Sequence, residues 1–351
     1  MSGIASVSAA PVVHHPPVHR RVMFAVSDAE RALFFSGALA QELRAFEGAS
    51  DNTLPNGRDW LAILESVQPE ILVTCWSTPA LPEKWLLVDD CPLRYVCHVT
   101  GSVRGVVPRA FLERGGHVTN WGGIASPQVA EHALLLALAA LRSLPQWRTT
   151  PWGGDGMPAT VPLGTRTLFG RRVGLHGFGR VANAIIELLK PFGVTFYAHS
   201  AGVPEEVFRS RNVIPCDSLV SLFSQSEVLF ECEALTPQSE ASVTAKVLAA
   251  LPDGAVFVNV GRGRIVEEDA LVREAASGRI SVAADVIAEE PLSPFAPIGS
   301  LPDVILSPHI AGPTYDCCPQ CGKLALENVQ RYLDGEPLRE VVSLDAYDRS
   351  T

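Results

Sequence analysis

The stretch VGLHGFGRVANAIIELL, residues 173–189, decides the fold of this chain. Its first residues are mostly apolar and predict a short buried strand over 173–176. The residues that follow place apolar side chains on one face at helical spacing: Val181, Ile185, Leu188 and Leu189. A proline at 191 and a glycine at 193 predict the end of that helix. A strand followed directly by a helix is the repeating unit of a parallel α/β sheet.

The loop GFGRVA, residues 177–182, joins the predicted strand to the predicted helix and has the pattern G-x-G-x-x-A. Small residues permit a tight turn and a close approach of the backbone to a pyrophosphate, and the helix start adds free N–H groups. An ordinary tight turn can show the same pattern, but the position between strand and helix favours a dinucleotide site. The expected cofactor contacts in this loop are Gly177, Phe178, Gly179, Arg180 and Val181.

The same alternation of strands and helices extends in both directions from the loop. The N-terminal side shows strand patterns over 21–26, 70–75 and 93–99 and helical patterns over 32–46 and 129–141. The C-terminal side shows strand patterns over 194–198, 212–215, 228–232, 255–260, 280–286 and 304–307, and helical patterns over 219–225 and 267–278. The order predicts an α/β fold with doubly wound parallel sheets and right-handed crossovers. A length of 351 residues predicts two domains.

The composition is that of an acidic globular protein. Hydrophobic residues make up 47% of the chain, and 38 acidic against 28 basic residues give a formal net charge of −10. This balance argues against a nucleic-acid partner. The apolar helix over 129–141 is too short to span a bilayer and carries Glu131 and His132, so no membrane span is expected.

The N-terminus and the cysteines indicate an intracellular protein. Residues 1–20 contain three prolines and no sustained apolar core, which predicts a disordered tail and no secretory signal. Eight cysteines are scattered through apolar runs, which fits reduced thiols in the cytoplasm. Cys318 and Cys321 form one C-x-x-C pair without a second pair, so we expect helix-start cysteines near the cleft, and we expect no metal site.

The end of the next predicted strand bears on the choice between NAD and NADP. An acidic residue at this place binds the ribose hydroxyls and disfavours a 2′-phosphate. Ser200 stands there, and no arginine follows immediately. Because a serine hydroxyl binds the ribose weakly and repels no phosphate, the preference stays open, and we expect both NAD and NADP to be used.

Four further segments complete the pattern: VTNWGGIASPQVAEHAL (118–134), VNVGRGRIVEEDAL (258–271), AADVIAEEP (283–291) and SPHIAG (307–312). In this order, over residues 93–328, the chain resembles the D-isomer-specific 2-hydroxyacid dehydrogenase family, which includes D-lactate, glycerate/hydroxypyruvate and phosphoglycerate dehydrogenases. The resemblance implies a nucleotide domain inserted into a flavodoxin-like substrate domain. It also implies a homodimer that pairs through the nucleotide domains.

The resemblance assigns roles to individual residues. Arg262 matches the substrate-binding arginine, His309 the acid/base, and Glu290 the carboxylate paired with that histidine. Gly101 and Ser102 match the loop whose backbone N–H groups hold the substrate carboxylate. The remaining expected cofactor contacts are Ser200, Thr236, Val260, Asp285, which matches the residue beside the nicotinamide amide, and Gly312.

These residue types suit the reduction of a 2-oxo acid. A planar arginine can bridge the carboxylate and the carbonyl oxygen, and an imidazolium can supply the proton that this oxygen needs. Taken singly, Arg262 is more typical of a surface ion pair, Glu290 of a solvated loop, and His309 of the edge of a core. Their position after the strands of one parallel sheet favours a catalytic set.

The sequence departs from the family pattern at two places. Arg104 stands where an aspartate is common, which bears on the substrate, and Glu233 and Ala234 replace a small residue and a proline near the cofactor ribose.

The domain boundaries follow from the resemblance and the motif order. We expect a tail over 1–20, a discontinuous substrate domain over 21–125 and 312–345, and a Rossmann NAD(P)-binding domain over 126–311. The predicted function is an NAD(P)-dependent oxidoreductase acting on a small 2-oxo or D-2-hydroxy acid. The alternative is an NAD(H)-sensing binding protein, because the same fold occurs in corepressors whose dimerisation responds to NAD(H).

Overall fold

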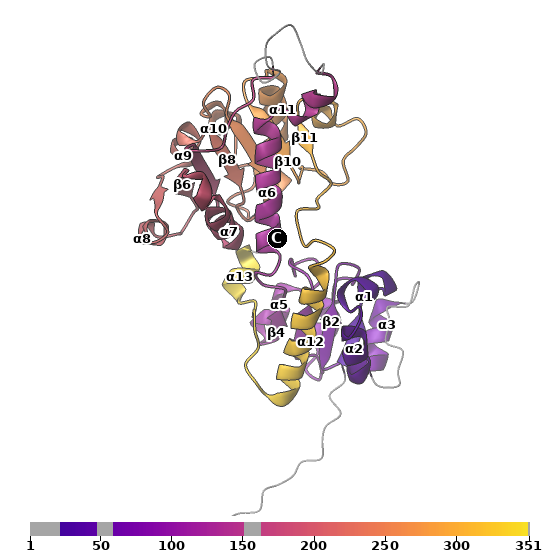
Figure 1. The fold of residues 1–351 in the computed structure, drawn as a ribbon. Coiled ribbons are helices and arrows are strands. Elements are labelled where there is room, and N and C mark those ends of the chain that lie inside the picture. The colour runs from indigo at the N-terminus through magenta and orange to yellow at the C-terminus, as the bar shows by residue number, and fades with distance from the viewer. Residues whose placement is uncertain (1–21, 48–58, 151–162, 350–351) are drawn as a thin grey trace, which may run out of the picture.

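The computed structural model describes residues 22–47, 59–150 and 163–349. The tail expected over residues 1–20 lies outside them. The described chain forms two parallel sheets with helices packed against them (Figure 1). The predicted α/β class with two parallel sheets is confirmed.

The first sheet has its strands in sequential order among the described residues: β1 (Val22–Ala25), β2 (Ile71–Thr74), β3 (Tyr95–His98) and β4 (His117–Thr119). Alternate side chains point to opposite faces, so two cores form. One face is covered by α3 (Trp60–Val67), α4 (Glu83–Leu86), α5 (Arg109–Glu113) and α13 (Leu344–Arg349). The other face is covered by α1 (Asp28–Phe34), α2 (Leu39–Glu47) and α12 (Cys318–Asp334).

The single helix expected over 32–46 is two helices. α1 ends at Phe34, and Gly37 between α1 and α2 has a φ of +62°. Because this left-handed conformation favours glycine and ends a helix, apolar spacing across the break gave the wrong length.

The second sheet contains every strand expected on the C-terminal side: β5 (Arg172–His176), β6 (Thr195–His199), β7 (Val213–Pro215), β8 (Val228–Glu231), β9 (Val256–Asn259), β10 (Ser281–Ala284) and β11 (Ile305–Leu306). The strands are parallel in the order β11-β10-β9-β8-β5-β6-β7. The direction of winding reverses between β5 and β8. In open parallel sheets, ligands bind beyond the carboxyl ends of the strands at such a switch point.

Helices cover both faces of this sheet. One core lies under α6 (Ser126–Leu141), α7 (Arg180–Leu189) and α8 (Glu205–Arg209), and the other under α9 (Leu219–Gln225), α10 (Ala245–Ala249) and α11 (Glu268–Ala276). Short 3-10 helices are η1 (Leu144–Arg148), η2 (Lys190–Phe192), η3 (Gly263–Ile265) and η4 (Pro297–Ser300). The predicted apolar face of α7 needs one correction: Leu188 is 37% exposed, whereas Ile186 is buried.

Two long helices mark the passages between the sheets. The chain reaches the second sheet through α6, which packs against α7, and it returns through α12, which packs against α1 and β3 (Figure 1). The boundaries near residues 125 and 312 stay a prediction. Among the described residues, no helix has the length and apolar character needed to cross a membrane.

Candidate active site

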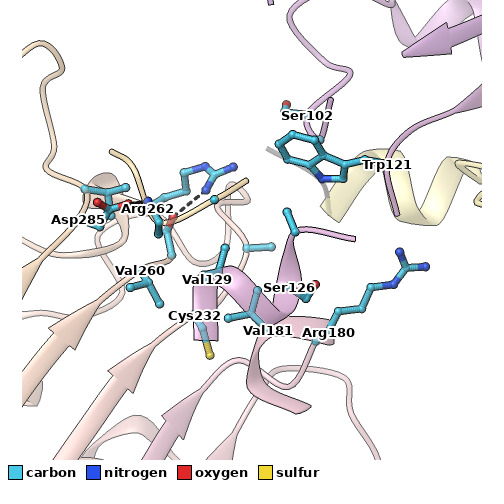
Figure 2. A pocket seen from close by; sticks show the side chains of 18 of the residues that line it. Ser102, Trp121, Ser126, Val129, Arg180, Val181, Cys232, Val260, Arg262 and Asp285 are labelled. Atoms are coloured by element: carbon cyan, nitrogen blue, oxygen red, sulfur yellow. Dashed lines mark hydrogen bonds between the residues drawn. The ribbon is translucent and has the colours of Figure 1, made fainter. Parts of the chain in front are cut away.

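A cavity of about 780 Å³ is lined by loops and helix ends from both halves of the described chain. Figure 2 shows Ser102 and Trp121 of the first half on one side, and Arg262 and Asp285 of the second half on the other. The predicted residues brought together in its lining are Gly101, Ser102, Gly179, Arg180, Val181, Val260, Arg262, Asp285, His309 and Gly312.

The glycine loop turns sharply between β5 and α7. Gly177 has a φ of +95°, and a Cβ there would lie 2.7 Å from the backbone of Glu233, so only glycine fits. The Cβ position of Gly179 is open, and no side chain caps the start of α7. The ring of Phe178 packs on Phe208, with centroids 4.5 Å apart. The cavity therefore meets an uncapped helix N-terminus, which favours an anion.

A carboxylate lies beside the loop at the end of β6. The Ser200 hydroxyl donates to Oε2 of Glu233 at 2.7 Å. Glu233 lines the cavity, whereas Thr236 lies in a turn, where its backbone N–H donates to Ser239 at 2.7 Å. Ser200 and Thr236 are not among the residues that line this cavity.

A buried ion pair lies beneath the glycine loop. His176 Nδ1 and Glu231 Oε2, at the ends of β5 and β8, are 2.5 Å apart, and both residues are buried. Burial alone lowers the pKa of His176, but the charge and hydrogen bond of Glu231 outweigh it, with help from Glu233, and the pKa is raised above its ordinary value. Burial and the same two carboxylates raise the pKa of the Cys232 thiol well above its usual range. No local sequence pattern indicates this pair.

His309 and Glu290, which the resemblance pairs, lie in contact. His309 Nδ1 and Glu290 Oε2 are 2.6 Å apart, and the His309 backbone N–H donates to Asp285 O at 2.9 Å. The His309 backbone has a φ of +55°, a strained conformation for a histidine, and the two side chains are 49% and 36% exposed. Strain of this kind is retained where the surroundings hold a residue for its function.

Asp285 holds the segment that carries His309. Its buried carboxylate accepts hydrogen bonds from Ile310 N at 2.9 Å, Ala311 N at 2.9 Å and the Ser307 hydroxyl at 2.5 Å. His132 of α6 bonds to the same Ser307 hydroxyl at 2.8 Å. A carboxylate with several donors is a strong anchor because each bond is charge-assisted.

Arg262 lies on a tightly packed loop after β9. Its Nη1 donates to Gly261 O at 2.7 Å, and the buried Asn259 side chain accepts from Gly261 N at 3.0 Å. A Cβ on Gly263 would lie 1.8 Å from the carbonyl carbon of Ile287, which explains the glycine after the arginine. Burial lowers the pKa of the Arg262 guanidinium, and the charge of Glu290 opposes that shift.

The opposite wall presents the loop over 100–102. Asn120 Nδ2 donates to Gly101 O at 2.7 Å, and the Trp121 ring fills the space where a Gly101 side chain would lie. This packing leaves the Gly101 and Ser102 backbone at the cavity.

Comparisons with known proteins agree with this geometry. The family model described as "D-isomer specific 2-hydroxyacid dehydrogenase, NAD binding domain" matches residues 134–311. The chain belongs to this family.

The dehydrogenase is 31% identical to the glyoxylate reductase of Aeropyrum pernix, over 71% of this chain and 76% of the relative. It is 30% identical to the human glyoxylate reductase/hydroxypyruvate reductase, over 66% of this chain and 71% of the relative. A solved NADPH-dependent glyoxylate/hydroxypyruvate reductase of Sinorhizobium meliloti, in complex with citrate, matches with a TM-score of 0.72 and 26% identity, covering 93% of this chain and 98% of the other. The chain is thus an NAD(P)-dependent 2-hydroxyacid dehydrogenase, and the predicted enzyme class is confirmed.

Sequence reasoning missed several residues around the dehydrogenase's site. Arg349 lines the cavity from the end of α13. Arg104, where the family pattern has an aspartate, lies 5.9 Å from the ring centroid of Tyr347 and is not in the cavity lining. His132, on the helix that joins the two sheets, reaches Ser307 beside the site. Its polar side chain within an apolar helix was the available signal.

Proposed function

We propose that the cavity between the sheets interconverts a 2-oxo acid and its D-2-hydroxy acid, with His309 as the acid/base. One observation carries the proposal. The His309 imidazole, bonded to Glu290, and the Arg262 guanidinium line the same cavity as the uncapped start of α7. A proton-transfer group and a substrate anchor thus share a space with a site for an anionic cofactor.

The loop fits a dinucleotide, because the backbone at Gly179 is open to the cavity and the helix N–H groups there have no side-chain cap. Gly179, Arg180 and Val181 would hold the pyrophosphate, and Val260 and Asp285 would border the nicotinamide. A bound nicotinamide supplies or accepts the hydride.

The chain's own residues position the acid and move the proton. Arg262 binds the substrate carboxylate and carbonyl oxygen with its planar donors, and the backbone at Gly101 and Ser102 holds the carboxylate from the other wall. Because Nδ1 of His309 is engaged by Glu290, the proton passes through Nε2 to the carbonyl oxygen during reduction and returns during oxidation.

An assay of a panel of 2-oxo acids with NADH and NADPH, with chiral analysis of the products, tests this function. Steady turnover to D-2-hydroxy acids is the expected result. Formation of the L-isomer would refute the proposal. Tight dinucleotide binding without turnover of any acid would favour the NAD(H)-sensing binding protein instead.

We infer a cytoplasmic homodimer as the working form. On the apolar helix α6, the Leu135 side chain is 57% exposed, which supports its burial against a second copy of the chain. The family's pairing through nucleotide domains supports the same assembly. The eight cysteines are free thiols, which suits a reducing compartment.

A further inference from the structure

The Glu233 side chain crosses the glycine loop from one strand to another. Glu233 follows β8, but its Oε2 accepts the hydroxyl of Ser200, which follows β6, at 2.7 Å. Its Oε1 accepts from Ala234 N at 2.9 Å. Since β5 lies between β8 and β6, the carboxylate sits over the end of β5, where the loop begins.

This is the place where a dinucleotide-binding sheet meets the adenosine ribose. The pyrophosphate lies on the glycine loop, and the residue at the end of the following strand binds the ribose hydroxyls. Here that residue is Ser200, and Glu233 both bonds to it and lines the cavity beside Gly179. A carboxylate offers about four lone-pair sites, so Glu233 keeps acceptor capacity beyond its two bonds.

We propose that Glu233 selects NAD(H) over NADP(H), supplying from β8 the acidic group that the end of β6 lacks. Its carboxylate accepts the ribose 2′-hydroxyl and repels a 2′-phosphate. The inference rests on the cofactor site proposed above. The expectation that both cofactors are used rested on the lack of an acidic side chain at the end of β6, and the hydrogen bond between Ser200 and Glu233 brings such a charge there from β8.

The neighbouring arginines do not offset this charge. Arg209 and Arg211 follow β6, but Arg209 pairs with Glu205 at 2.9 Å and Arg211 lies 3.8 Å from Glu187. A 2′-phosphate, with a charge of about −1.5 to −2, would have to draw one of them away while facing Glu233.

Calorimetric binding of NADH and NADPH to the full chain without substrate tests the proposal. The variants are Glu233→Gln, which keeps the shape and removes the charge, and Glu233→Ala, which serves if the first does not fold. Glu240→Gln is the matched control, since this carboxylate follows the same strand, pairs with Arg264 and is not among the cavity-lining residues.

We expect the wild type to bind NADH at least about thirtyfold tighter than NADPH, and Glu233→Gln to lower that ratio by about tenfold or more, mainly by tightening NADPH. Glu240→Gln should leave the ratio unchanged. Equal wild-type affinities, or an unchanged ratio in both Glu233 variants, would overturn the inference while leaving the proposed function intact. A wild type that binds neither dinucleotide would overturn both.

Discussion

His309 and Glu290 are joined by a hydrogen bond of 2.6 Å between Nδ1 and Oε2, although 19 positions separate them in the sequence. The carboxylate fixes the ring and balances the charge that forms when the imidazole takes up a proton. Nδ1 therefore orients the ring through its bond to Glu290, and Nε2 is the nitrogen that can transfer the proton.

Replacing His309 by asparagine should remove proton transfer and keep cofactor binding. We expect turnover at saturating substrate to fall by at least about a hundredfold, with the NADH dissociation constant nearly unchanged. Steady-state kinetics and calorimetry measure the two quantities. Unchanged turnover would eliminate His309 as the acid/base.

Arg262→Lys keeps the positive charge and loses the planar two-point contact. Catalytic efficiency should fall by more than about tenfold. Arg264→Lys is the control, because Arg264 is exposed and pairs with Glu240 on the surface. Near-wild-type efficiency for Arg262→Lys would assign Arg262 a structural role.

Asp285→Asn should weaken the fold as well as the site. An amide has one acceptor oxygen where the carboxylate has two, so at least one of the N–H groups of Ile310 and Ala311 loses its partner. We expect the free energy of unfolding to fall by about 1–3 kcal/mol in urea titration. Asp303→Asn, at an exposed bond to Gln146, should change it little. Equal stability of the two variants would contradict the anchoring role of Asp285.

The buried pair of His176 and Glu231 gives a pH dependence with a definite sign. Because the folded-state pKa of His176 is raised, the pair's stabilisation is complete below 6.5, the ordinary histidine value, and is lost as pH rises through the folded-state pKa. Urea unfolding between pH 6 and pH 9 should show a steeper loss of stability for the wild type than for Glu231→Gln. If stability depends on pH with the same slope in the wild type and in Glu231→Gln, the pair is not the source of the pH dependence. His117→Gln, at the surface, serves as the control.

Sedimentation velocity at micromolar concentration tests the homodimer. We expect a dimer for the wild type and a shift toward monomer for Leu135→Glu, because a charge would be placed on the exposed apolar side of α6. A monomeric wild type would contradict the inference.

Apart from β4, which was not expected from the sequence, the strands and the order of the motifs were predictable from sequence because each depends on a few adjacent residues. The seven strands of the second sheet and the G-x-G-x-x-A turn are local patterns of this kind. The break at Gly37 was missed because one glycine in an apolar run does not reveal whether its φ is positive. The burial of Ile186 instead of Leu188 depends on how α6 packs against α7, which helical spacing does not specify.

The side-chain partnerships at the site were less predictable, since they join residues on different strands. Ser200 and Glu233 meet only because β6 and β8 flank β5, an order that the sequence does not state. The pairing of His176 with Glu231 and the bond from His132 to Ser307 depend on the same three-dimensional order. The separation of His309 and Glu290 is also long, and the family resemblance, not spacing, indicated that pair.

The contacts that hold Arg262, Glu290 and His309 come from the second half of the chain, whereas Gly101 and Trp121 belong to the first. On the proposed assignment, the residues that hold the cofactor and move the proton lie in one half of the chain, and the wall that faces them across the cavity lies in the other. Mutations near Trp121 can then alter the accepted acid during evolution, or in directed redesign, without disturbing the chemistry opposite. The wall carrying Trp121 is accordingly the place to begin a change of substrate.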